Sequence, residues 1–139
     1  MNKYSICDNK SGKITKRMTC DKKLISLQLS NDEFYIQGDY DDSLYYISLD
    51  DLSVKNKPDL PVTIDKSEIQ ADGLDIVTIN NLPISEPNGN TVSTFIEVAG
   101  QVHEITDGIF EFTTDLLGTY IFICKATNYL NKEFIVEAV

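Results

Sequence analysis

The side chains best suited to catalysis are few in this 139-residue chain. General acid–base chemistry would use the single histidine, His103, together with a carboxylate, and Glu104 is its neighbour in sequence. Both lie in an alternating segment that predicts a β-strand, where adjacent side chains point to opposite faces, so they cannot act as a pair. No nucleophile motif such as Gly-x-Ser-x-Gly is present. We expect His103 to be an ordinary strand residue, and the protein to have no catalytic residue and no enzymatic activity.

Carboxylates are densest at residues 39–42, where the order Asp-Tyr-Asp-Asp raises the question of calcium. An EF-hand loop that began at Asp39 would carry glycine at its sixth position and glutamate at its twelfth, but the chain has Leu44 and Asp50 there. We therefore predict a solvated acidic turn, no bound metal and no cofactor. The alternative is an irregular calcium site between the two halves of the chain, which would draw on Asp50, Asp51, Asp65 or Asp72.

The three cysteines, Cys7, Cys20 and Cys124, are odd in number, and their spacing matches no zinc-binding pattern. Residues 1–8 have no apolar stretch after their lysine, so we expect no secretory signal and synthesis in a reducing cytoplasm. Free buried thiols are then the expected state. The alternative is a disulfide between Cys7 and Cys20 across a hairpin.

Aromatic side chains offer binding instead of catalysis. Tyrosine is enriched at protein interfaces because its ring is apolar while its hydroxyl group forms hydrogen bonds. The first half of the chain concentrates tyrosines on or beside short predicted strands, where alternation must turn some of them outward. The candidate protein-docking residues are Tyr35, Tyr40, Tyr45 and Tyr46.

The net charge of −10 is unevenly distributed. Residues 1–61 carry nine Lys/Arg and ten Asp/Glu, a net charge of −1, whereas residues 62–139 carry three and twelve, a net charge of −9. An acidic second half repels phosphate backbones, so we expect no nucleic acid among the partners. No run approaches the roughly 18 apolar residues of a membrane-spanning helix, so we expect no membrane span.

The elements that must position these side chains are predicted to be short strands. Residues 4–7 and 13–18 alternate on either side of the turn formers at 8–12 and predict a hairpin. Three further strands are predicted at 24–29, where a helix is the alternative, at 33–38 and at 44–49. Together they predict a small N-terminal β-meander.

Two prolines within residues 58–61 hold the backbone extended and predict a linker there. The linker separates an N-terminal docking module, 1–57, from a second module, 62–139. The second module contains about seven short strands separated by turns, the pattern typical of an immunoglobulin-like β-sandwich. The predicted fold class is therefore all-β.

Local signals refine the second module. Asp107-Gly108 lies between two alternating segments and predicts the type I′ turn of a hairpin, because both residues tolerate positive φ. Residues 118–126 are apolar on both faces, as in a central strand. Tyr120 follows a turn and resembles a tyrosine corner, in which the hydroxyl group bonds back to upstream backbone. A loop is predicted at 84–90, with Pro87 and an Asn88-Gly89 turn.

Several different short motifs follow one another along the chain in a characteristic order. Residues 4–14 read Tyr-x-Ile-x-Asp-x-x-Ser-Gly-x-Ile, and a tyrosine-rich strand at 45–47 precedes the proline-rich linker. The second half contains Ala-Asp-Gly-x-Asp at 71–75, Leu-Pro at 82–83, Asp-Gly-x-x-x-Phe at 107–112 and Asp-Leu-x-Gly-Thr-Tyr at 115–120. Over most of its length the chain resembles a class of small tailed-bacteriophage virion proteins encoded among tail and fibre genes.

The resemblance implies a structural virion protein that is made in the host cytoplasm. It would be an adaptor or accessory subunit of the tail and fibre region, present in several copies and bound to tail, fibre or capsid subunits. The first module would dock, and the sandwich would be a spacer or an exposed module. Two alternatives stay open: a capsid decoration protein with its immunoglobulin-like module outward, and a module that binds host-surface carbohydrate, which the absence of tryptophan disfavours.

Overall fold

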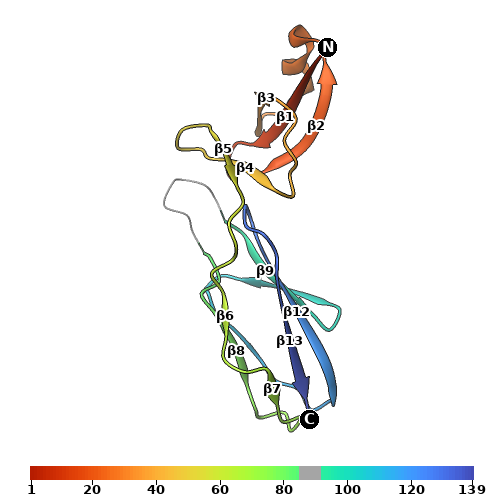
Figure 1. Ribbon diagram of the computed structural model, residues 1–139, viewed down its shortest axis with the longest axis vertical. Helices are drawn as coiled ribbons and strands as arrows, with labels where there is room; N and C mark the ends of the chain where they lie inside the picture. The colour runs from red at the N-terminus through yellow and green to blue at the C-terminus, as the bar shows by residue number, and fades with distance from the viewer. Residues whose placement is uncertain (85–91) are drawn as a thin grey trace. The chain divides into compact units, whose positions relative to one another are not determined.

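The computed structural model describes residues 1–84 and 92–139 (Figure 1). They form two compact units, Met1–Pro58 and Asp59–Ile84 with Ser93–Val139, and each is described by itself. Strands dominate both units, so the predicted all-β class is confirmed. The predicted loop at 84–90, with Pro87 and the Asn88-Gly89 turn, lies outside the described residues except at Ile84.

The first unit is built on an antiparallel sheet with the order β2-β1-β3. The strands are β1 (Asn2–Asp8), β2 (Ile14–Cys20) and β3 (Glu33–Gln37). The predicted hairpin of the first two strands is confirmed, with Tyr4 opposite Met18. The sheet is not a meander, however, because β3 pairs with β1 instead of β2. This order makes β1 the central strand and buries its residues 4–7 on both faces.

The segment 24–29, predicted as a strand, lies largely in a 3-10 helix, η1 (Lys22–Gln28). Its apolar residues suggest strand alternation, but only Ile25 is buried, and Leu27 is 76% exposed. Ile25 packs with Tyr4 and Ile6 in what we call the helix-side core. The chain must cross over β1 between β2 and β3, so this segment covers a sheet face and does not extend an edge.

A second hairpin covers the other face of the sheet. It consists of β4 (Tyr45–Ile47) and β5 (Val54–Asn56). Ile47 is fully buried with Cys7 and Ile14, and we call these three residues the hairpin-side core. The sequence predicts β4 but not β5, whose only apolar residue is Val54. The first unit therefore has two small cores, one on each face of a three-stranded sheet.

The second unit consists of a five-stranded sheet and a three-stranded sheet. The larger has the order β10 (Gln101–Ile105), β9 (Thr94–Val98), β12 (Gly118–Ala126), β13 (Lys132–Ala138) and β7 (Glu68–Ile69). The smaller has the order β11 (Phe110–Phe112), β8 (Val77–Asn80) and β6 (Thr63–Ile64). The predicted central strand at 118–126 is confirmed, because β12 pairs with β9 on one side and with β13 on the other.

The inner faces of these two sheets form the core of the second unit. Phe122 of β12 is fully buried, and its ring lies 5.1 Å from that of Phe112 and 6.3 Å from that of Phe110, both on β11. Ile79 of β8 and Ile96 of β9 are also fully buried. The two sheets therefore pack face to face through inward-pointing apolar side chains, as in a sandwich.

The predicted hairpin at Asp107-Gly108 is wrong. The strands on its two sides belong to different sheets, since β10 pairs with β9 and β11 pairs with β8. The two-residue turn with positive φ occurs instead at Ala99 and Gly100, which join β9 to β10 with φ values of 53° and 75°. An Asp-Gly turn is compatible both with a hairpin within one sheet and with a connection between two sheets. Burial of the β11 aromatic rings against the larger sheet decides which strand pairs with which.

The predicted tyrosine corner is present in the second unit. The Tyr120 hydroxyl group donates to the carbonyl oxygen of Leu116 at 3.0 Å and lies 2.9 Å from Thr114 Oγ1. These two contacts tie the start of β12 to the turn that precedes it.

We expect Tyr120→Phe to lower the free energy of unfolding of the second unit by about 1 kcal/mol, because the hydrogen bond to the turn is lost. The ring contact with Phe112, at 5.2 Å between centroids, is retained in this variant. Urea denaturation followed by the amide signals of β12 measures the change. Stability equal to that of the unmodified chain would show that the corner contributes nothing.

Candidate protein-docking site

The structure does not gather the four predicted docking tyrosines on one surface. Tyr35 of β3 shares its sheet face with the helix-side core, and its ring stands at a right angle to that of Tyr4, 5.5 Å away. Tyr40 and Tyr45 lie on the opposite face, with their rings 6.1 Å apart, and pack against the hairpin-side core. Tyr46 is half-buried and points to the other side of β4. Only Tyr35, at 41% exposed, presents a large open ring.

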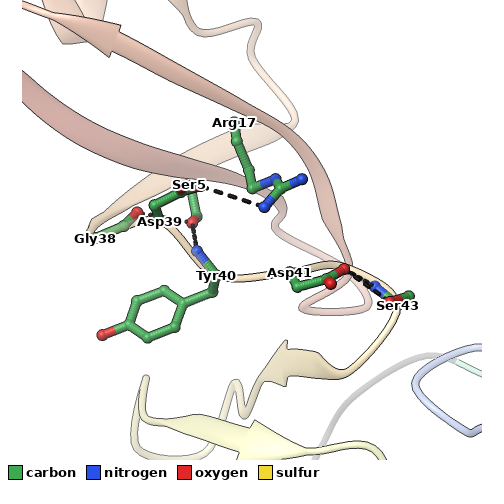
Figure 2. A network of polar contacts seen from close by, with 7 residues as sticks. All are labelled: Ser5, Arg17, Gly38, Asp39, Tyr40, Asp41 and Ser43. Carbon is green, nitrogen blue, oxygen red and sulfur yellow. Dashed lines mark hydrogen bonds and ion pairs between the residues drawn. The ribbon is translucent and has the colours of Figure 1, made fainter.

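Tyr40 is held in place by a serine that is completely buried in β1. Ser5 Oγ donates to the carbonyl oxygen of Gly38 at 2.9 Å and accepts from the backbone N–H of Tyr40 at 3.1 Å (Figure 2). The N–H of Gly38 donates to the carbonyl oxygen of Lys3 at 2.8 Å. The loop after β3 is therefore bonded to the central strand on both sides of Asp39.

The Tyr40 ring fills the space beside Gly38. This glycine has a φ of 125°, which L side chains rarely adopt, and a Cβ atom there would stand 2.6 Å from the Tyr40 ring. Neither Ser5 nor Gly38 is among the residues to which the sequence assigns a role. The signal for them is a small polar residue inside an apolar central strand, together with a glycine directly after another strand.

Two hydrogen bonds, one at each end of β3, determine which residues of β3 form hydrogen bonds with β1. The N–H of Asn9 donates to the carbonyl oxygen of Asp32 at 2.8 Å, and the N–H of Gly38 donates across to Lys3. Hydrogen-bonded positions alternate along an antiparallel pair, so the even-numbered residues of β3 bond to β1. The N–H and C=O groups of the odd-numbered residues point away from it.

These outward groups belong to an edge that no described strand covers. The N–H of Glu33 already donates to the Ser30 carbonyl oxygen at 3.2 Å, so the open stretch of the edge lies at Tyr35 and Gln37. An extended segment of another protein can add to such an edge through main-chain hydrogen bonds. The opposite edge strand, β2, carries Lys16, and charges of this kind discourage strand addition. The β3 edge is therefore the candidate docking site.

A polar hollow of about 490 Å³ lies beside β1 and β2. Its lining consists of Lys3, Arg17, Met18, Thr19 and Asp39. Arg17 Nη1 and Asp39 Oδ1 are 3.4 Å apart across it (Figure 2), and both side chains are more than 40% exposed. Exposed pairs of this kind contribute at most about 1 kcal/mol. The charges of Arg17 and Asp39 in this hollow compensate each other.

Three of the four acids considered for an irregular calcium site, all except Asp50, accept hydrogen bonds from nearby residues. Asp51 accepts from Ser53, Asp65 from Thr78, and Asp72 from Leu74 and Asp75. The bonds from the two backbone N–H groups hold the pKa of the Asp72 carboxyl below its usual value. Asp41 in the first unit likewise accepts from the Ser43 hydroxyl and N–H groups, which lowers its pKa (Figure 2). Within residues 1–84 and 92–139, no three His, Cys, Asp or Glu side chains are grouped to hold a metal ion.

His103 lies on β10 as a strand residue, as predicted. Its side chain is on the inner face, opposite Ile96, and its ring centroid lies 5.2 Å from that of Phe110. Glu104 is exposed on the other face of the same strand. The two side chains therefore do not form an acid–base pair.

All three cysteines are free thiols. Cys20 is opposite Asn2, whereas Cys7 is opposite Ile14 at the other end of the hairpin. Five residues of strand correspond to about 17 Å, far beyond the ~7 Å between Cα atoms that a disulfide spans. The alternative of a disulfide between Cys7 and Cys20 is therefore excluded. Cys7 and Cys124 are buried as expected, while Cys20 is only half-buried.

We expect Cys20 to be alkylated by iodoacetamide at about pH 8 well before the other two thiols, since only thiolates react. Burial raises the pKa of Cys7 from 9.0 to about 12 and that of Cys124 to about 11. Unfolded thiols ionise first, so the stability linked to these groups is complete below about pH 9 and is lost as the pH rises toward 12. Mass spectrometry of the alkylated peptides measures the order, and equal labelling of all three would contradict it.

A scan against models of protein families finds no match to this chain, and a search of the curated proteins finds none either. The described residues contain no helix long and apolar enough to cross a membrane. The candidate docking site therefore rests on the geometry of the first unit.

Proposed function

We propose that this protein is structural and binds other proteins by strand addition at the β3 edge. The observation that carries the proposal is the outward direction of the backbone groups of Tyr35 and Gln37 on an edge without a described partner strand. Main-chain hydrogen bonds supply affinity in this mode, and neighbouring side chains supply specificity. The Tyr35 ring, which packs at a right angle to the buried Tyr4 ring, is a preorganised anchor that loses little conformational entropy on binding.

The second unit acts in this proposal as a spacer or exposed module with an immunoglobulin-like fold. The strand order supports it: β6 pairs with β8 in the smaller sheet, and the chain then switches to pair β7 with β13 in the larger. The Tyr120 corner lies at the start of β12, where the chain has just passed from β11 of the smaller sheet to the larger sheet. These features are typical of immunoglobulin-like sandwiches.

The setting that we propose is the virion of a tailed bacteriophage, with the protein as an adaptor or accessory subunit in the tail and fibre region. The motifs at 4–14 and 115–120 support it, because they carry the resemblance to virion proteins. Its partners are then tail, fibre or capsid subunits, and its copies follow the symmetry of the assembly.

Copy number tests this setting. Particles of the phage that encodes the chain are purified and digested, and peptides of this chain are quantified by mass spectrometry against labelled standards. A subunit of a closed ring on the tail is expected at about six or twelve copies, whereas a decoration protein would reach the order of hundreds. Absence of the chain from purified particles would contradict both assignments.

We expect Tyr35→Lys to reduce the copies per particle at least tenfold, since removal of a central anchor typically costs about 2 kcal/mol or more of binding free energy. Lysine also places a charge on the edge where the partner strand adds. The matched control is Thr19→Lys, which makes the same charge change on β2, the opposite edge strand. Incorporation of Tyr35→Lys at the level of this control, with amide exchange showing both variants folded, would refute strand addition at β3.

A further inference from the structure

The outward face of the five-stranded sheet in the second unit carries an apolar patch. Its members are Val102 of β10, Ile121 and Ile123 of β12, and Ile135 of β13. Val102, Ile121 and Ile135 are 63%, 50% and 59% exposed. They alternate with buried residues such as Phe122 and Val136, so the patch lies on the face that points away from the sandwich core.

The register of the sheet brings these four side chains together. Ile121 is directly opposite Ile135, and Ile123 lies two residues further along β12 on the same face. Ile123 is opposite Glu97, which is in turn opposite Val102. A shallow hollow of about 390 Å³ beside the β9–β10 turn has Val102, Ile121 and Ile123 in its lining. The residues thus form one surface, unlike isolated apolar side chains, which occur on any protein.

Carboxylates surround this patch. Glu104, Glu133 and Glu137 occupy outward positions on β10 and β13, and Glu68 of β7 is opposite Glu137. Glu97 lies within the patch and is paired with Lys125, whose Nζ is 2.9 Å from its Oε1. On the outward face of the five-stranded sheet, the described strands therefore carry five carboxylates and one ammonium group.

We propose that this face is a second docking surface, and that its occupant is a protein segment in which apolar side chains are interspersed with Lys or Arg. The apolar centre would be removed from water while the cations meet the acidic rim, the usual division between interface core and rim. A second copy of the chain does not fit, because two such rims would repel each other. The surface is independent of the β3 edge and belongs to the other unit.

The test uses the full chain, labelled with ¹⁵N, and two synthetic peptides of about ten residues. In one peptide Val and Ile alternate with Lys, and in the other Glu replaces every Lys. We expect the basic peptide to shift the amide resonances of β9, β10, β12 and β13, and its affinity to fall several-fold between about 50 and 300 mM salt. The acidic peptide should shift none of them.

A pair of variants locates the binding. Ile121→Lys places a cation in the centre of the patch and should weaken binding of the basic peptide at least tenfold. Leu117→Lys makes the same charge change at a residue that is 76% exposed outside the patch and should leave the affinity unchanged. Equal binding by the two variants, equal shifts with the acidic peptide, or no binding of the basic peptide at millimolar concentration would overturn the proposal. So would sedimentation of a dimer that Ile121→Lys dissociates, since the occupant would then be a second copy.

Discussion

Phe122→Ala is expected to lower the free energy of unfolding of the second unit by about 3–5 kcal/mol, the usual cost of removing a buried aromatic ring. Phe122 is fully buried and meets both Phe110 and Phe112, so its loss opens a cavity between the two sheets. Small domains have total stabilities of about 5–15 kcal/mol, so this loss is a large part of the whole.

Hydrogen exchange read by mass spectrometry measures the effect, because peptides from the two units are resolved. Amides of β9 and β12 should lose protection in Phe122→Ala, while those of β1 should keep theirs, since each unit has its own core. Phe122→Leu is the matched control: it retains most of the buried volume and should cost roughly 1–2 kcal/mol. A similar loss in the two variants would show that the ring contacts do not hold the sheets together.

Gly38→Ala is expected to have the second-largest effect and to dislodge Tyr40. An alanine at a φ of 125° costs about 1–3 kcal/mol in backbone strain alone. Its Cβ atom would also meet the Tyr40 ring at 2.6 Å, so the ring must leave its position against the hairpin-side core. Displacement of the ring strains the bonds from Ser5 to the same loop.

Gly118→Ala separates these two contributions. Gly118 has a φ of 147°, but a Cβ atom there would have no neighbour within 4 Å, so this variant carries the backbone cost without the clash. Thermal unfolding gives the two losses, and tyrosine ring resonances report the position of Tyr40. If Gly38→Ala cost no more than Gly118→Ala and the Tyr40 signals were unchanged, the ring would not be a structural part of the loop.

The strands themselves were largely predictable from the chain, because alternation and turn residues act locally. Tyr4 and Ile6 alternate with smaller residues, and the strand that contains them forms where expected. Partner choice was not predictable at Asp107-Gly108, because the dipeptide fixes only a tight turn. Whether the next strand pairs locally or joins the other sheet depends on where its aromatic rings are buried and on its partner strand β8, in which Ile79 lies far earlier in the chain than Phe110.

The candidate site shows the same division between local and distant causes. Tyr35 and Tyr40 are equally plausible docking residues in sequence, since both follow from tyrosine chemistry on or near a strand. Tyr40 instead packs inward because Ser5, 35 residues away, fixes its backbone and Gly38 leaves room for its ring. The open edge of β3 arises because β3 pairs with β1 on one side and with no described strand on the other, an arrangement that depends on the whole sheet and not on β3 alone.

The parallel pairing of β7 with β13 has a mechanical consequence. The N–H of Glu137 donates to Ser67 at 3.0 Å, the N–H of Val139 to Ile69 at 2.9 Å, and the N–H of Ala71 to Val139 at 2.8 Å. Tension applied through the start of β7 and the end of β13 pulls these parallel strands in opposite directions along their length. The three hydrogen bonds are then loaded together in shear and cannot be opened one at a time, so the second unit should resist stretching along this direction more strongly than stretching that separates the strands sideways.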